Sequence, residues 1–209
     1  MIIKVCGMRD PDNIRSLENL EIDYMGFIFY AKSPRYVMGD DGQINAIHQS
    51  KKKKAGVFVN EEATKIIDIA RIYQLDTIQL HGNESPEICF ALHEKGYGVI
   101  KAFQIAFAND FKQTEKYLDC VDYFLFDTKY IGYGGSGKRF DWSLLQEYKE
   151  SISFILSGGL TSDCLSDIKN LNHPQFAGVD LNSGFEISPG VKDFEKIKTF
   201  IKQLNNRKI

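Results

Sequence analysis

Short apolar runs alternate with helical patterns along the whole chain, and this alternation predicts an α/β fold of the (β/α)₈ TIM-barrel type. Each run is rich in β-branched and aromatic residues and is followed by a longer segment with helical spacing. The runs mostly lack strict alternation of apolar and polar residues, as expected of parallel strands buried on both faces. The 209 residues suffice for one barrel, so we expect a single domain over residues 1–209.

Eight segments are predicted as strands from their apolar composition. They are Ile2–Cys6, Tyr24–Phe29, Ala55–Val59, Thr77–Leu80, Gly98–Phe103, Tyr123–Phe126, Ser153–Leu156 and Ala177–Leu181. Eight strand–helix units in a chain of this length favour a closed barrel. An open, doubly wound sheet is the alternative, although such sheets usually have fewer strands.

Helical periodicity is clearest in Glu61–Tyr73 and Asp193–Leu204, where apolar residues recur three or four positions apart. Asn60, Ser85 and Thr161 stand just before helical segments. Because short polar side chains accept hydrogen bonds from the first free backbone N–H groups of a helix, we predict these three residues as N-caps.

The net charge of −2 gives no long-range attraction toward nucleic acid or an anionic membrane, so we expect neither as a partner. The run Lys51–Lys54 is the one strong block of charge. A nucleic-acid patch is one interpretation of this run. A solvated helix end that leads into a strand is the interpretation we favour, because cations complement the negative end of a helix dipole.

The chain opens directly into a strand-like run, without the pattern of a secretion signal, and no apolar stretch approaches about 18 residues. The four cysteines are scattered and form no C-x-x-C pair. These features predict a protein of the reducing cytoplasm.

Reactive residues stand at the predicted carboxyl ends of strands, where a barrel holds its active site. Cys6 ends the first strand, and Asp127 ends the sixth. A thiol at a strand end can face a substrate and serve as a base once ionised, and a neutral carboxyl can donate a proton. The alternatives are a buried, inert thiol and an aspartate that caps a turn. Facing one another across the barrel mouth, the two groups would form a base–acid pair.

The last two predicted strand ends read as a phosphate site. Ser157-Gly158-Gly159 follows the seventh strand, and Ser183-Gly184 follows the eighth. Glycines let backbone N–H groups approach an anion closely, and the loops after strands 7 and 8 are where barrels commonly bind phosphate. Tight turns without a ligand are the alternative.

Three more side chains are expected to contact the substrate: Arg35 after the second strand, His81 at the end of the fourth and Asp180 in the eighth. The planar guanidinium of Arg35 suits a carboxylate, with a surface ion pair as the alternative. The histidines are too dispersed for a metal cluster and no dinucleotide fingerprint is present, so we expect no cofactor. The segment Gly132–Gly137 is a candidate lid.

These segments resemble the phosphoribosylanthranilate isomerase family of tryptophan biosynthesis. The matching stretches follow the family's order: Lys4–Met8, Gly26–Tyr30, Lys32–Tyr36, Gly56–Asn60, Gln79–Gly82, Phe126–Thr128, Gly134–Gly137, Phe140–Trp142, Leu156–Leu160 and Asn182–Glu186. The family typically has valine where this chain has Leu181 and Phe185. Both differences are apolar exchanges, and we expect them to alter only the packing next to the phosphate.

The resemblance implies a cofactor-free Amadori rearrangement of N-(5-phospho-β-D-ribosyl)anthranilate to 1-(2-carboxyphenylamino)-1-deoxy-D-ribulose 5-phosphate. Carried over residue by residue, it makes Asp127 the general acid and Cys6 the general base. It assigns the anthranilate carboxylate to Arg35 and the phosphate to the two glycine loops. The small-molecule partner is then a phosphosugar, and we expect a monomer.

Other enzymes on the same scaffold remain alternatives. Barrels that isomerise aminoaldoses of the histidine pathway would have an aspartate in place of Cys6. The next synthase of the tryptophan pathway would need catalytic lysine and glutamate residues, a set that Lys101 alone does not supply. A ribulose-phosphate epimerase would need metal-binding histidines and carboxylates. A non-catalytic phosphosugar-binding barrel would keep the glycine loops but would have no use for Cys6 and Asp127.

Overall fold

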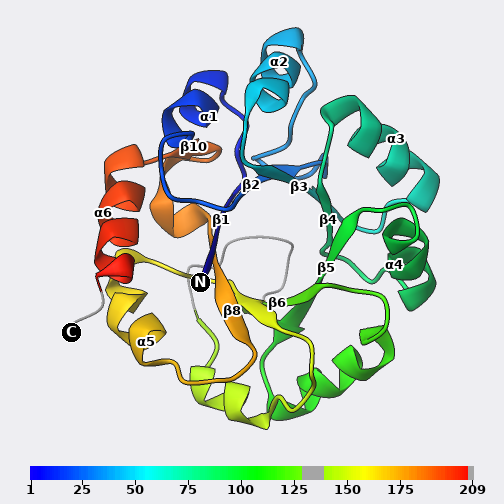
Figure 1. Ribbon diagram of the computed structural model, residues 1–209, viewed down its shortest axis with the longest axis vertical. Coiled ribbons are helices and arrows are strands. Elements are labelled where there is room, and N and C mark those ends of the chain that lie inside the picture. Colours follow the sequence, from blue (N-terminus) through cyan, green and yellow to red (C-terminus); the bar gives the residue numbers. More distant parts are fainter. Residues whose placement is uncertain (129–138, 207–209) are drawn as a thin grey trace.

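The computed structural model describes residues 1–128 and 139–206 and shows a closed barrel of parallel strands in sequence order (Figure 1). The eight strands are β1 (Ile2–Cys6), β2 (Tyr24–Ile28), β3 (Lys53–Phe58), β4 (Thr77–Leu80), β5 (Gly98–Ile105), β6 (Tyr123–Thr128), β7 (Phe154–Leu156) and β8 (Phe176–Leu181). Strand β1 pairs with both β2 and β8, which closes the sheet. The predicted (β/α)₈ barrel is confirmed, and the open sheet is wrong.

Helices form a ring outside the strands (Figure 1). The α-helices are α1 (Pro11–Leu17), α2 (Asp41–Gln49), α3 (Ala63–Tyr73), α4 (Pro86–His93), α5 (Leu165–Asn170) and α6 (Phe194–Asn205). The 3₁₀ helices are η1 (Ala108–Tyr117), η2 (Trp142–Glu147), η3 (Ser162–Cys164) and η4 (Ser183–Phe185). A short antiparallel hairpin, β9 (Glu186–Ser188) with β10 (Val191–Lys192), lies between β8 and α6.

Two of the three predicted caps lie at helix starts. Ser85 precedes α4, whose first residue is Pro86, and Thr161 precedes η3, but the Ser85 side chain forms no capping hydrogen bond. The prediction for Asn60 is wrong, because Glu62 is the residue that precedes α3. Asn60 has a left-handed backbone with φ of 52°, and its side chain accepts a hydrogen bond from the backbone N–H of Asn83 at 2.6 Å. It therefore ties two neighbouring loops together instead of capping a helix.

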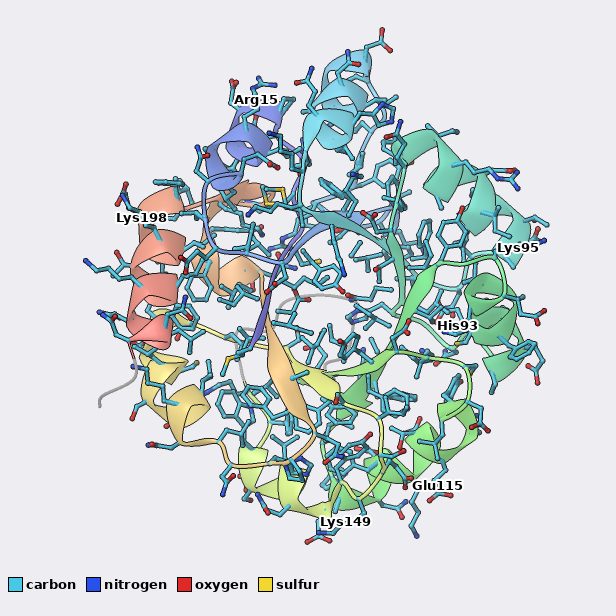
Figure 2. All side chains as sticks on the ribbon, viewed as in Figure 1. Arg15, His93, Lys95, Glu115, Lys149 and Lys198 are labelled. Atoms are coloured by element: carbon cyan, nitrogen blue, oxygen red, sulfur yellow. The ribbon has the colours of Figure 1, made fainter. Side chains whose placement is uncertain are left out.

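Apolar packing occurs on both sides of the strands. Most of the buried apolar residues pack between the strands and the helices, while Ile100, Ala102, Leu125 and Ile155 form a small cluster inside the barrel. Charged side chains such as Arg15 and Lys198 point outward from the helices (Figure 2). Successive side chains of a strand point alternately to the helices and to the barrel interior, so polar residues that face the interior stand two positions apart.

Three aspartates stabilise the amino end of the barrel by the same contact. Asp23, Asp76 and Asp122 each stand just before an even-numbered strand. Their carboxylates accept hydrogen bonds from a backbone N–H near the start of the preceding strand, at 2.7 to 2.8 Å. Because this face lies opposite the catalytic end of a barrel, these contacts serve stability.

The run Lys51–Lys54 follows α2 and enters β3, as the helix-end interpretation predicts. Within the part of the chain that the structure describes, no helix has the length and apolar character to cross a membrane.

Candidate active site

A pocket opens at the carboxyl ends of the strands, and all nine predicted site residues line it. They are Cys6, Arg35, His81, Asp127, Gly158, Gly159, Asp180, Ser183 and Gly184. Six strands and their following loops supply them: β1, β2, β4, β6, β7 and β8. Residues far apart in the sequence therefore meet, because a closed parallel barrel brings the carboxyl ends of all strands to one face. The candidate lid, Gly132–Gly137, lies outside the described residues.

Cys6 lies at the end of β1, where its buried side chain lines the pocket. A Cβ atom on Gly26, the partner of Cys6 in β2, would approach the Cys6 Sγ to 2.7 Å. Glycine at position 26 thus leaves room for the thiol. Burial raises the pKa of the Cys6 thiol, and the neighbouring Lys4 ammonium opposes that rise without overcoming it.

Lys4 and Asp180 form a buried ion pair beside Cys6, with 2.9 Å between Nζ and Oδ2. They are direct partners in the β1–β8 ladder, and Lys4 faces the same side of β1 as Cys6 because two positions separate them. Burial lowers the pKa of Lys4, but Asp180 and Cys6 outweigh it and leave this pKa raised. The pair places a positive charge next to the thiol.

Asp180 also offers a free acceptor to a ligand. Burial raises the pKa of its carboxyl group, and Lys4 works against that rise. The second oxygen, Oδ1, is buried without a hydrogen-bond partner among the described residues, in a side chain that lines the pocket. Because an unsatisfied buried acceptor is costly, a ligand hydroxyl is a natural partner for it.

Asp127 is held by two contacts in the last residues of β6. Its Oδ1 accepts a hydrogen bond from the backbone N–H of Thr128 at 2.7 Å, and its Oδ2 lies 3.3 Å from His81 Nε2. On the other side of the imidazole, His81 Nδ1 lies 3.0 Å from the amide nitrogen of Gln79. In this amide orientation Gln79 donates to Nδ1, which leaves Nε2 as the ring nitrogen that faces the Asp127 carboxylate. Gln79 and His81 thus orient the carboxyl group.

The two glycine loops require glycine for steric reasons. Gly158 and Gly159 have φ of 81° and 66°, a left-handed backbone that other residues adopt only with strain. A Cβ atom on Gly158 would lie 2.5 Å from Asp127 Oδ1, and one on Gly184 would lie 2.0 Å from the carbonyl oxygen of Leu160. The loop after β8 therefore packs directly on the loop after β7, and the loop after β7 packs on Asp127.

Arg35 reaches the pocket from the loop after β2 and pairs with Glu186 of β9. The guanidinium Nε lies 2.9 Å from Oε1, and Nη2 lies 2.7 Å from Oε2. Lys192 of β10 also contacts Glu186, at 2.5 Å, and its Nζ donates to Asn182 Oδ1 at 2.8 Å. The ion pair that stood as the alternative for Arg35 exists, but at the pocket and not on the open surface.

Sequence reasoning missed Lys4, Gln79, Glu186 and Lys192 as parts of the site. Lys4 and Gln79 stand two positions before Cys6 and His81, so strand alternation places each pair on the same face. The two-residue alternation of a strand is therefore the sequence signal that could have identified Lys4 and Gln79. Glu186 closes one of the stretches that matched the family, but Lys192 stands in no such stretch, and only the hairpin register pairs it with Glu186.

Comparison with known proteins agrees with the fold. The family model described as N-(5'phosphoribosyl)anthranilate (PRA) isomerase matches residues 3–203. An N-(5'-phosphoribosyl)anthranilate isomerase of Parabacteroides distasonis is 54% identical over 206 residues, which cover 98% of this chain and 93% of the relative.

Two solved structures match over nearly the full length. The phosphoribosyl anthranilate isomerase from Thermotoga maritima superposes with a TM-score of 0.87 at 36% identity, covering 99% of this chain and 100% of that chain. A phosphoribosyl anthranilate isomerase in complex with reduced 1-(o-carboxyphenylamino)-1-deoxyribulose 5-phosphate gives a TM-score of 0.84 at 33% identity, with coverage of 99% and 100%. With the matched model and the identity to relatives taken together, this chain belongs to the N-(5'-phosphoribosyl)anthranilate isomerase family.

Proposed function

We propose that the protein isomerises N-(5-phospho-β-D-ribosyl)anthranilate, an aminoaldose, to the aminoketose 1-(2-carboxyphenylamino)-1-deoxy-D-ribulose 5-phosphate by general acid–base catalysis. The observation that carries this proposal is the meeting of Cys6 and Asp127 in one pocket with Arg35 and the two glycine loops. The pocket thus combines a base, an acid, a carboxylate-binding cation and a phosphate-binding cradle. The substrate carries the matching groups: a sugar whose C2′ proton becomes acidic once the iminium forms, a carboxylate and a phosphate.

The reaction begins at the sugar ring. Asp127 donates its proton to the ring oxygen, the C1′–oxygen bond breaks, and the anthranilate nitrogen lone pair forms an iminium. The Cys6 thiolate then removes the C2′ proton, and the electron pair of that C–H bond flows into the iminium to give an enolamine. Water then protonates C1′ and accepts the C2′ hydroxyl proton, which gives the ketone. Exchange with solvent returns Cys6 to the thiolate and Asp127 to the neutral acid. The substrate's own iminium accepts the electrons, so this sequence needs no metal and no organic cofactor.

The remaining residues bind and orient. We assign the carboxylate to Arg35 and the phosphate to Gly158, Gly159, Ser183 and Gly184. The unpartnered Oδ1 of Asp180 supports a hydrogen bond from a sugar hydroxyl. His81, which contacts Asp127, would lie within reach of the same substrate.

Turnover of the named substrate tests this function. The purified protein should abolish the fluorescence of N-(5-phospho-β-D-ribosyl)anthranilate. The synthase that follows in the tryptophan pathway should then consume the product. A reduced product analogue should compete with the substrate. Tight binding of the analogue without any turnover would identify a non-catalytic phosphosugar-binding barrel instead.

Replacing Gly158 by alanine should lower kcat as well as raise KM. The new Cβ strains a left-handed backbone, at a cost of about 1–2 kcal/mol, and it also collides with the Asp127 carboxylate. Steady-state kinetics at saturating and limiting substrate would separate the two effects. Gly96→Ala is the matched control, because Gly96 has φ of 85° but no atom within 4 Å of the added Cβ. Should only KM change, the contact with Asp127 has no catalytic consequence.

Replacing Lys4 by methionine should shift ionisation of the Cys6 thiol to higher pH. The Lys4 ammonium lowers the pKa of a thiol that burial raises, and its removal also leaves the Asp180 charge unpaired nearby. A thiolate would then persist only at more alkaline pH than in the wild type. The measurement is the alkylation rate of Cys6 against pH, with the modified residue located by peptide mass.

Lys101→Met is the control for the Lys4 variant. It also removes the cation of a buried ion pair, here with Glu84 at 3.3 Å, but from a position outside the pocket. Its alkylation profile at Cys6 should match the wild type. An unchanged profile in the Lys4 variant would show that the ammonium does not stabilise the thiolate.

We also propose that the protein acts as a monomer in the cytoplasm. All nine assigned site residues line one pocket within a single chain. The four cysteines are free and buried, which suits a reducing compartment in which the catalytic thiol stays reduced. Sedimentation at micromolar concentration measures the oligomeric state.

A further inference from the structure

We propose that Glu186 is a positioning residue that, held by Lys192, orients the Arg35 guanidinium and so makes the pocket selective for a substrate with a carboxylate. This inference rests on the role that the proposed function gives Arg35. The residue that selects the substrate is then not the arginine alone but a three-residue unit, Arg35–Glu186–Lys192, built by the loop after β2 and the β9–β10 hairpin.

The contact between Arg35 and Glu186 fixes the direction of the guanidinium. Its Nε lies 2.9 and 3.1 Å from the two carboxylate oxygens, and Nη2 lies 2.7 Å from Oε2. A guanidinium presents its donors in a planar fork, so a bidentate contact on one edge fixes the plane. Among the described residues no hydrogen bond reaches Nη1, and Arg35 lines the pocket. The unused edge is therefore the one available to a ligand.

Glu186 is itself held firmly. Its Oε1 accepts from the fully buried Lys192 ammonium at 2.5 Å and from the backbone N–H of Gly190 at 3.0 Å. Residues 186 and 192 are direct partners in the hairpin. The backbone of Lys192 is in turn clamped by Asn13, which accepts from its N–H at 2.8 Å and donates to its carbonyl at 2.9 Å. The carboxylate therefore sits on a rigid frame.

The charges of the unit favour an anionic ligand. Burial would raise the pKa of Glu186, but Arg35 and Lys192 outweigh it and hold this pKa below its usual value, so the carboxylate stays ionised. Burial lowers the pKa of Lys192, and Glu186 opposes that change. With both cations charged, the unit itself carries one net positive charge. A substrate carboxylate would neutralise it, whereas an uncharged aromatic ring would not.

The unit also lies next to the proposed base. A Cβ atom on Gly7 would lie 2.6 Å from Arg35 Cδ, 2.8 Å from Asn182 Oδ1 and 3.4 Å from Lys192 Nζ. Glycine at position 7, directly after Cys6, therefore lets the arginine stem and the lysine ammonium pass over the end of β1. Recognition of the carboxylate and removal of the C2′ proton are thus neighbouring events, so a tilted guanidinium would misplace the ring that carries the carboxylate.

Titration with two reduced product analogues tests the proposal. One carries the 2-carboxyphenyl group and the other carries a plain phenyl group, so their affinity ratio measures selectivity for the carboxylate. In Glu186→Gln the amide keeps the shape but turns N–H donors toward two cations. We expect affinity for the carboxylated analogue to fall about 10- to 100-fold, with affinity for the phenyl analogue little changed. Glu195→Gln, on the exposed side of α6, should change neither affinity.

A double-mutant cycle with Arg35→Ala separates the possible outcomes. In the Arg35→Ala background, Glu186→Gln should have no further effect on selectivity, because Glu186 acts only through the arginine. Glu186→Asp keeps the charge on a shorter side chain and should recover part of the selectivity. The same variant replaces Glu186→Gln in the test if the glutamine variant does not fold. Equal weakening of both analogues in the Glu186 variants would overturn the proposal and leave a structural role. Selectivity that survives Arg35→Ala would instead overturn the role assigned to Arg35.

Discussion

Replacing Cys6 by serine is expected to lower kcat by about 10²- to 10⁴-fold, the range that a positioned general base contributes. A hydroxyl loses its proton far less readily than a thiol, and the buried position that raises the pKa of Cys6 would disfavour an alkoxide still more. Serine occupies slightly less space and leaves the binding residues in place, so affinity for the reduced product analogue should stay near that of the wild type. Parallel turnover and titration measurements separate the two quantities.

Cys120→Ser serves as the control for the Cys6 variant. Cys120 is also a free, buried thiol, but it lies outside the pocket. Its replacement should leave turnover near the wild-type value. If the Cys6 variant also turned over normally, the thiol would be an inert part of the core.

Replacing Asp127 by asparagine is expected to reduce kcat on the same scale. The amide is nearly isosteric with a protonated carboxyl, and its oxygen can still accept the hydrogen bond from the backbone N–H of Thr128. It has no acidic proton to give to the ring oxygen, so the C1′–oxygen bond loses its assistance. Because the contacts that bind the substrate remain, the loss should appear in kcat and not in analogue affinity.

Asp122→Asn is the matched control, since Asp122 stands just before the opposite end of β6 and accepts from the backbone N–H of Val99 at 2.7 Å. That variant should change stability slightly and turnover not at all. Normal turnover by the Asp127 variant would show that the Asp127 carboxyl group only caps a turn and takes no part in the mechanism.

The barrel was predictable from the sequence because each strand has an apolar centre, but several strand ends were not. The pairs Gln104–Asp127 and Ile105–Thr128 continue the β5–β6 ladder beyond the apolar runs. Backbone hydrogen bonding between neighbouring strands, not side-chain hydrophobicity, holds these residues extended. Asp127 consequently lies inside β6 and not at its last position. At the other end, Lys53 begins β3 because its neighbour in β2, Tyr24, pairs with it.

The site was predictable where its residues follow strands, and not where it depends on charge pairing across the fold. Lys4 pairs with Asp180 across 176 positions, and Arg35 pairs with Glu186 across 151. No local sequence pattern predicts these ion pairs, because closure of the barrel and formation of the β9–β10 hairpin bring the partners together. The failed N-cap at Asn60 has the same cause, because a contact with the next loop replaces the local one.

The two family departures show where packing differs. Phe185 is fully buried, and its ring lies 4.9 Å from that of Phe200 of α6 in an edge-to-face arrangement. The larger side chain is thus accommodated by the outer helix. Leu181 is likewise fully buried at the end of β8.

The central claim is that the rearrangement proceeds by proton removal at C2′ and proton addition at C1′, with Cys6 and Asp127 as the groups that move protons. Turnover in deuterium oxide, in the presence of a strong chelator, tests it most directly. The account predicts the same activity with and without the chelator, and a product that carries one solvent-derived deuteron at C1′, read by mass spectrometry and proton NMR. A product that retains the original C2′ hydrogen at C1′, or activity that the chelator abolishes and a divalent ion restores, would contradict it.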